Sequence, residues 1–124
     1  MNPIDTAALD TLFIKARTAN GFLDKPVPED LLRRVYEIAA LGPTSMNTQP
    51  TRYVFLNTKE ARERLLPAML PGNLDKTRSA PVTVIVATDT KFYEYMPKVW
   101  HREGAKENFE ANAALASATA TRNG

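Results

Sequence analysis

The spacing of apolar residues predicts two amphipathic helices in the first third of the chain. The first begins at Asp5 or Thr6, either of which can cap it, and ends near residues 20–21, where a glycine tolerates a left-handed turn. The second follows Pro28, which suits a first helical turn, and stops before Gly42. Its apolar residues form a broad stripe of the kind that packs on a core.

Two runs of β-branched and aromatic residues predict strands. The segment RYVFL, residues 52–56, is bounded by Pro50 and Asn57. The segment PVTVIVAT, residues 81–88, is almost entirely apolar, which predicts a central strand that is buried on both faces. Two strands alone do not complete a sheet, so further strands are expected to join them.

Further helices are expected between and after these strands. A capping box of Asn57 and Glu60 predicts a helix that runs to about Leu66, and Asn73 is placed to cap a short one. An alanine-rich helix is expected from about Asn108. The order helix–helix–strand–helix–strand–helix predicts a single α+β domain over residues 1–124.

Composition narrows the function classes. The 124 residues are 44% hydrophobic and 24% charged, which is typical of a soluble globular domain. The 16 basic and 14 acidic residues are interspersed, which argues against a nucleic-acid partner. Without cysteine, and with His101 as the one histidine, a thiolate or multi-histidine metal site within one chain is excluded. Neither a signal peptide nor a membrane span is indicated, so we expect a cytoplasmic protein without a membrane partner.

Three polar segments stand out: ARTANG (residues 16–21), GPTSMNTQP (42–50) and PGNLDK (71–76). Each has a purely structural interpretation. The first suits a helix end, the second a helix-to-strand connection whose amides bond their own backbone, and the third a turn with a helix cap. Taken singly, the first and third segments favour the structural interpretation.

Taken together and in register, these segments resemble the nitroreductase family of flavin enzymes. The closest resemblance is to the malonic semialdehyde reductase group of pyrimidine catabolism, on ARTANG, GPTSMNTQP and GNLDKTRSAPVT. The resemblance covers essentially all of residues 1–124 and implies a nitroreductase-like α+β fold, a sheet flanked by helices. Because family members are longer, and because the tail FEANAALASATATRN resembles the start of their long central helix, we expect only the N-terminal portion of that fold, truncated at the C-terminus.

The resemblance implies FMN as cofactor and nominates the residues that hold it. A guanidinium suits the phosphate, and side-chain amides both donate and accept, as the ribityl hydroxyls and the pyrimidine edge require. Gln49 is expected to hold the loop itself. The residues implied by resemblance are Arg17, Thr18 and Asn20 near the phosphate and ring edge, Thr44, Ser45 and Asn47 along the flavin, Asn73 at the pyrimidine edge, and Lys76 near the substrate or nicotinamide.

The same resemblance implies an NAD(P)H oxidoreductase with ping-pong hydride transfer through flavin N5. NADPH or NADH is the donor, and the acceptor is a small aldehyde such as malonic semialdehyde, or a nitro or quinone compound. The chemistry is carried by the flavin, so no dedicated catalytic side chain is implied. Family sites form between two subunits, which implies a homodimer. The alternative is a truncated, non-catalytic fragment that dimerises or binds a partner without retaining flavin.

Aromatic residues between the second strand and the last helix leave two interpretations open. They either line a substrate or flavin face, or pack in a core or on the surface. His101 follows Trp100 and is interpreted as a surface residue, and Asp89 as the end of a strand. The aromatic residues concerned are Phe92, Tyr93, Tyr95 and Trp100.

Overall fold

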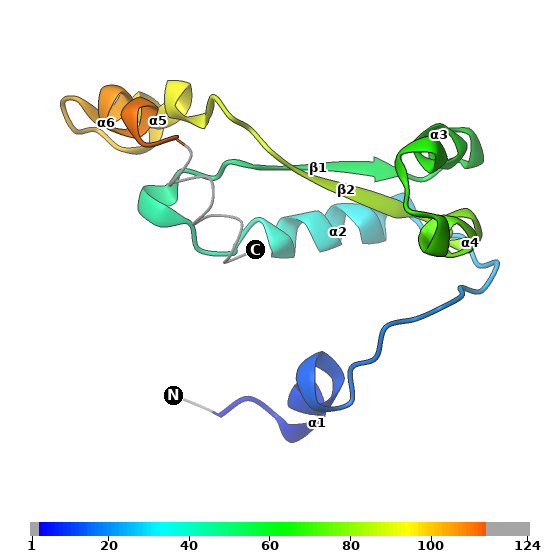
Figure 1. The fold of residues 1–124 in the computed structure, drawn as a ribbon. Helices are drawn as coiled ribbons and strands as arrows, with labels where there is room; N and C mark the ends of the chain where they lie inside the picture. Colours follow the sequence, from blue (N-terminus) through cyan, green and yellow to red (C-terminus); the bar gives the residue numbers. More distant parts are fainter. Residues whose placement is uncertain (1–2, 114–124) are drawn as a thin grey trace.

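The computed structural model describes residues 3–113, and at its centre lies a two-stranded antiparallel sheet (Figure 1). Strand β1 (Thr51–Leu56) pairs with β2 (Thr83–Thr88), with Thr51 opposite Thr88 and Leu56 opposite Thr83. Both predicted strands are confirmed. Proline has no amide hydrogen for a strand ladder, and the second strand begins two residues after Pro81.

Helices gather at the two ends of this ribbon and along one side of it (Figure 1). Helices α3 (Lys59–Leu65) and α4 (Leu74–Ser79) connect the end of β1 to the start of β2. Helices α5 (Met96–Val99) and α6 (Ala105–Ala111) lie at the opposite end. Helix α2 (Glu29–Ala39) runs beside the sheet, where the rings of Tyr36 and Tyr53 meet edge to face at 5.9 Å. The predicted element order and the α+β class are confirmed.

The N-terminal helix is shorter than the sequence predicts. Helix α1 (Thr6–Leu9) is capped by Asp5, as expected, but continues only as a π-helical turn to Ile14. Residues 15–28 have no regular structure, and Figure 1 shows this segment running apart from the sheet. The prediction that the helix reaches residues 20–21 is wrong. Leu12, Phe13 and Ile14 in the π-helical turn are exposed, and a short helix without tertiary packing is marginal in water.

The cap of α3 lies one residue later than predicted. The Thr58 hydroxyl, rather than the Asn57 side chain, accepts a hydrogen bond from the backbone N–H of Ala61, at 3.1 Å. Asparagine and threonine both cap helices well, so the sequence alone does not specify which of the two adjacent residues becomes the cap. The Arg62 side chain on this helix donates to the carbonyl of Pro81 at 2.9 Å, which ties α3 to the start of β2.

Replacement of the true cap is expected to destabilise the protein measurably. Thr58→Ala removes the acceptor for the Ala61 N–H and is expected to lower the free energy of unfolding by about 1 kcal/mol. Asn57→Ala, one residue earlier, is the matched control and is expected to change it by less than about 0.5 kcal/mol. Urea unfolding of both variants checks this. Equal effects at the two positions would contradict the placement of the cap.

Each end of the ribbon has its own small core. At one end Phe92, Met96, Ala105 and Phe109 are buried, with Trp100 packed against them. Packing is therefore the interpretation that holds for Phe92, Tyr93 and Trp100, whereas Tyr95 is exposed. At the other end the buried residues are Leu66, Thr77 and Ala80.

The last helix begins earlier than predicted. Helix α6 starts at Ala105 rather than near Asn108, directly after Gly104, whose φ of 73° lies in the left-handed region. Glycine adopts this conformation without strain, so it allows the chain to turn into the helix here. The alanine-rich continuation beyond residue 113 lies outside the described residues.

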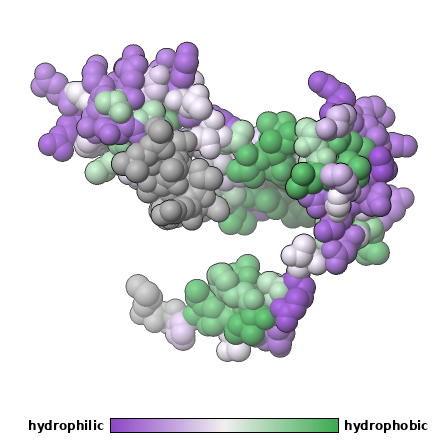
Figure 2. Space-filling view, viewed as in Figure 1, coloured by the Kyte–Doolittle hydropathy of each residue, from purple (hydrophilic) through white to green (hydrophobic). Residues whose placement is uncertain are grey.

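The prediction that β2 is buried on both faces is wrong for the described structure. Val84, Ile85 and Val86 are all exposed, the last with 63% of its surface accessible. A two-stranded ribbon offers no partner strand on its outer edges, and within residues 3–113 no second layer covers these side chains. Figure 2 shows the resulting apolar surface over the ribbon and over α1. Within the same described range, no helix combines the length and apolarity needed to cross a membrane.

Candidate functional site

The polar loop (residues 42–50) connects α2 to β1 and has an unusual backbone. It contains a 3₁₀ turn at Ser45–Asn47, and three of its residues have positive φ: Met46 at 49°, Asn47 at 57° and Gln49 at 43°. Asparagine tolerates this left-handed region, but for methionine and glutamine it costs on the order of 1 kcal/mol each. A loop with this backbone is held by the contacts around it.

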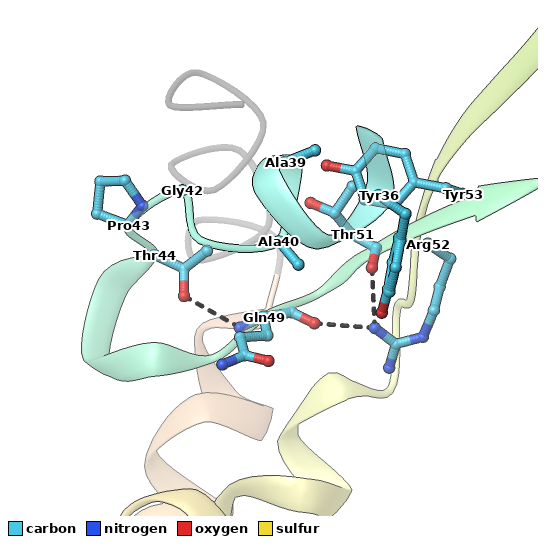
Figure 3. A pocket seen from close by; sticks show the side chains of 10 residues that line it. All are labelled: Tyr36, Ala39, Ala40, Gly42, Pro43, Thr44, Gln49, Thr51, Arg52 and Tyr53. Atoms are coloured by element: carbon cyan, nitrogen blue, oxygen red, sulfur yellow. Dashed lines mark hydrogen bonds between the residues drawn. The ribbon is translucent and has the colours of Figure 1, made fainter. Parts of the chain in front are cut away.

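Hydrogen bonds within the polar loop converge on Gln49. Its backbone N–H donates to the Thr44 hydroxyl at 3.1 Å (Figure 3), and its side-chain amide donates to the Asn47 side chain at 2.6 Å. Thr48 and Pro50 are buried, whereas Ser45 and Asn47 are exposed. The expectation that Gln49 holds the loop agrees with these contacts. The loop is thus anchored at its strand end and presents the hydroxyl and amide groups of its turn.

A cavity of about 410 Å³ lies between α2, the polar loop and β1 (Figure 3). Alanine and proline side chains give one part of its wall an apolar character. Hydroxyl, amide and guanidinium groups supply the polar part. This mixture suits a ligand that has both a flat apolar part and hydrogen-bonding groups. The lining residues are Tyr36, Ala39, Ala40, Gly42, Pro43, Thr44, Gln49, Thr51, Arg52 and Tyr53.

Arg52 lines this cavity and was not singled out from the sequence. Its guanidinium donates to the backbone carbonyls of Gln49 at 2.8 Å and Thr51 at 3.0 Å, and to the Asp89 carboxylate at 2.8 Å. Arginine within a strand pattern usually marks a side chain that faces solvent, so the sequence alone did not indicate that Arg52 lines a cavity. Asp89 does lie just past the end of β2, as predicted.

The third polar segment lies at the opposite end of the ribbon from the polar loop (Figure 1). Asn73 occupies the N-cap position of α4, yet its side chain makes no capping hydrogen bond. Lys76 is half-buried on the same helix. With a rise of roughly 3.3 Å per strand residue, the length of β1 alone puts on the order of 17 Å between the two ends.

The first polar segment lies on the irregular stretch after α1. Arg17, Thr18 and Asn20 are all exposed. The Arg17 guanidinium donates to the carbonyls of Ala16 at 2.7 Å and Ile14 at 3.3 Å. Within one chain the structure therefore groups Thr44, Ser45 and Asn47 and leaves the other predicted site residues at two separate places.

The side chains of these segments fit the chemistry of FMN. The Arg17 fork is exposed and suits a phosphate, and the exposed Ser45 and Asn47 suit ribityl hydroxyls. The Asn73 amide, which is not used for the cap, is available for a pyrimidine edge. The residues thus match the cofactor in kind, whereas a single chain does not bring them around one ligand. No metal site competes with this interpretation among the described residues, where no cluster of three or more metal-binding side chains occurs.

Curated relatives match nearly the whole chain. It is 49% identical over 121 residues to a protein of Stenotrophomonas maltophilia named "Putative NADH dehydrogenase/NAD(P)H nitroreductase", with 98% of this chain and 62% of the relative covered. A protein of Burkholderia lata with the same description is 46% identical over 123 residues, with 99% and 63% covered. The chain therefore spans less than two thirds of the length of these relatives.

A solved structure and a family model also match nitroreductases. The fold is similar to that of a "putative nitroreductase in complex with FMN" from Exiguobacterium sibiricum, with a TM-score of 0.68 at 14% identity, covering 99% of this chain and 63% of that one. At this identity the likeness concerns the fold alone. The model of the nitroreductase family matches residues 14–120. That match includes all three polar segments, and the chain belongs to the nitroreductase family.

Proposed function

We propose that the protein is an FMN-dependent NAD(P)H oxidoreductase. Membership of the nitroreductase family supports this class of activity. The observation that carries the proposal is the polar loop, where Thr44 and Gln49 line a cavity of about 410 Å³ and Ser45 and Asn47 lie exposed on the turn between them. Preorganised hydrogen-bonding groups beside a partly apolar cavity are what a flavin requires.

The chain's own residues would bind and orient the cofactor. In this proposal Arg17, with Thr18 and Asn20, holds the phosphate and ring edge, while Asn73 holds the pyrimidine edge and Lys76 contacts the substrate or nicotinamide. When bound, FMN supplies the capacity to accept a hydride from NADH or NADPH and to pass it on. The remaining residues of the proposal are Thr44, Ser45 and Asn47, which lie along the flavin.

We further propose that the protein acts as a homodimer in the cytoplasm and reduces a small aldehyde such as malonic semialdehyde, or a nitro or quinone compound. The separation of the three polar segments within one chain supports a site completed by a second subunit. The exposed apolar side chains of the turn after α1 (Leu12, Phe13 and Ile14) and of β2 support it too, because surfaces of this kind are usually covered by a partner.

An absorption spectrum tests the cofactor. The purified 124-residue chain is mixed with FMN, desalted and then given NADPH or NADH without oxygen. A flavin spectrum that survives desalting and bleaches with the nucleotide is the expected result, and turnover with malonic semialdehyde, a nitroaromatic and a quinone then ranks the acceptors. Colourless protein after desalting would count against the proposal.

A variant tests the proposed phosphate contact. Arg17→Gln is expected to raise the dissociation constant for FMN on the order of tenfold, because a charge-assisted hydrogen bond to phosphate is lost. The affinity for riboflavin, which lacks the phosphate, is expected to stay the same. Arg64→Gln on α3, also an exposed arginine, is the matched control. An equal loss of affinity for FMN and riboflavin would show that Arg17 does not contact the phosphate.

The alternative function is a non-catalytic protein that dimerises or binds a partner without flavin. The observation that favours it is the exposure of apolar side chains on α2, such as Leu31, Val35 and Ile38. Light scattering distinguishes the two: a stable dimer that remains colourless after FMN addition would favour this alternative over the oxidoreductase.

A further inference from the structure

The polar loop accepts a hydrogen bond from a side chain outside the loop, that of Arg52. Its left-handed residues, Met46, Asn47 and Gln49, adopt a backbone that side-chain-bearing residues rarely take. The bonds inside the loop, from Gln49 to Thr44 and Asn47, are exposed to solvent. Neither of these bonds uses the Gln49 carbonyl, which accepts a hydrogen bond from outside the loop.

The outside contact is made by Arg52. One terminal nitrogen of its guanidinium, Nη1, donates to the carbonyls of Gln49 and Thr51, and the other, Nη2, donates to the carboxylate of Asp89 at 2.8 Å. The planar fork directs donors to both sides at once, whereas a lysine ammonium concentrates its three donors on a single nitrogen. The side chain therefore connects the left-handed Gln49 to the far strand.

Asp89 is itself fixed by the sheet. The pairing of Thr51 with Thr88 brings Asp89 opposite Pro50, and the Asp89 backbone N–H donates to the Pro50 carbonyl at 2.8 Å. Its second carboxylate oxygen accepts from the backbone N–H of Lys91 at 2.9 Å. Three-quarters of the Asp89 side chain is shielded from solvent, against about half of that of Arg52. The anchor for Arg52 is thus held by two hydrogen bonds to the backbone and is partly desolvated.

We propose that Arg52, paired with Asp89, is a positioning residue that holds the polar loop in its cofactor-binding conformation. This inference rests on the proposed function for the identity of the cofactor. Arg52 lines the cavity, but its charge is matched by Asp89, so it acts through the backbone of Gln49 rather than as a ligand of the phosphate. Thr44, Ser45 and Asn47 then meet FMN already oriented, and the ordering cost of binding is reduced.

Order in the cofactor-free protein provides the first test. In the wild type, backbone NMR order parameters of residues 45–49 are expected to match those of β1, about 0.85, and in Arg52→Gln they are expected to fall below about 0.6. Arg34→Gln removes a more exposed ion pair, with Glu37 on α2, that does not touch the polar loop, and is the control. Unchanged order in Arg52→Gln would overturn the proposal whether or not the protein binds FMN.

FMN affinity and turnover provide the second test. Arg52→Gln is expected to raise the dissociation constant for FMN on the order of tenfold, with Arg52→Lys intermediate. At saturating FMN, kcat is expected to stay within about twofold of wild type, because bound cofactor orders the loop again. The double variant Arg52→Gln/Asp89→Asn is expected to bind no more than about twofold more weakly than Arg52→Gln alone, because the two residues act as one unit.

The outcomes separate this inference from the function on which it rests. A wild type that binds no FMN overturns the proposed function and the cofactor role of Arg52, while the order parameters still decide whether Arg52 holds the loop. A flexible loop with unchanged FMN affinity overturns the link to the cofactor. A lowered kcat at saturating FMN shows direct participation and overturns a positioning role. If Arg52→Gln fails to fold, Arg52→Lys and Asp89→Asn carry the same comparisons.

Discussion

Phe92→Ala is expected to lower the free energy of unfolding by about 3–5 kcal/mol, a large effect for a single substitution. Phe92 is 1% exposed, and its ring meets those of Phe109 at 6.0 Å and Tyr93 at 6.1 Å, both edge to face. The core that it shares with Met96 and Ala105 is small, so the cavity left by the ring cannot be refilled by neighbours. The loss is comparable to the total stability of many domains.

Urea unfolding monitored by tryptophan fluorescence measures this effect, because the protein has one tryptophan, Trp100, and its ring lies 5.8 Å from that of Phe109. Tyr95→Ala is the control, since Tyr95 belongs to the same turn but is 50% exposed, and a change below about 1 kcal/mol is expected. A loss below about 1 kcal/mol in Phe92→Ala would show that residues 92–111 do not fold around this ring.

Local chemistry made the strands and most helix positions predictable. The β-branched and aromatic runs of β1 and β2 favour an extended chain wherever they lie, and α2 ends at Ala39, before Gly42, as predicted. The end of α1 depends instead on tertiary packing, which its exposed apolar residues lack in the described structure. The exposure of β2 likewise depends on how many layers cover a sheet, and no local pattern specifies that number.

The candidate site was predictable in kind but not in arrangement. Small polar residues between two apolar elements drew attention to the polar loop, and three of them, Thr44, Ser45 and Asn47, do lie together there. Nothing in the sequence indicated the left-handed conformation of Met46, because residues with long side chains rarely adopt positive φ. The role of Arg52 depends on the register that brings Asp89 beside it, from 37 residues away in the sequence. Register follows from the pairing of whole strands rather than from either residue.

Leu66→Ala is expected to lower the free energy of unfolding by about 2–4 kcal/mol. Leu66 is 7% exposed and lies in the 3₁₀ turn between α3 and α4, where Thr77 and Ala80 are also buried. This turn contacts both helices, so the loss of the side chain loosens the packing of α4 against α3. Because Asn73 and Lys76 are placed by α4, the variant is also expected to weaken FMN binding if those residues contact the cofactor.

Leu70→Ala provides a matched control for this end of the ribbon. It removes the same side chain four residues later, where 73% of it is exposed, and is expected to cost less than about 0.5 kcal/mol. Urea unfolding compares the stabilities, and FMN titration compares the affinities. If Leu66→Ala lost stability but bound FMN as tightly as Leu70→Ala, the position of α4 would not matter for the cofactor. The proposed contacts of Asn73 and Lys76 would then be wrong, while those of the polar loop at the opposite end of the ribbon would be unaffected.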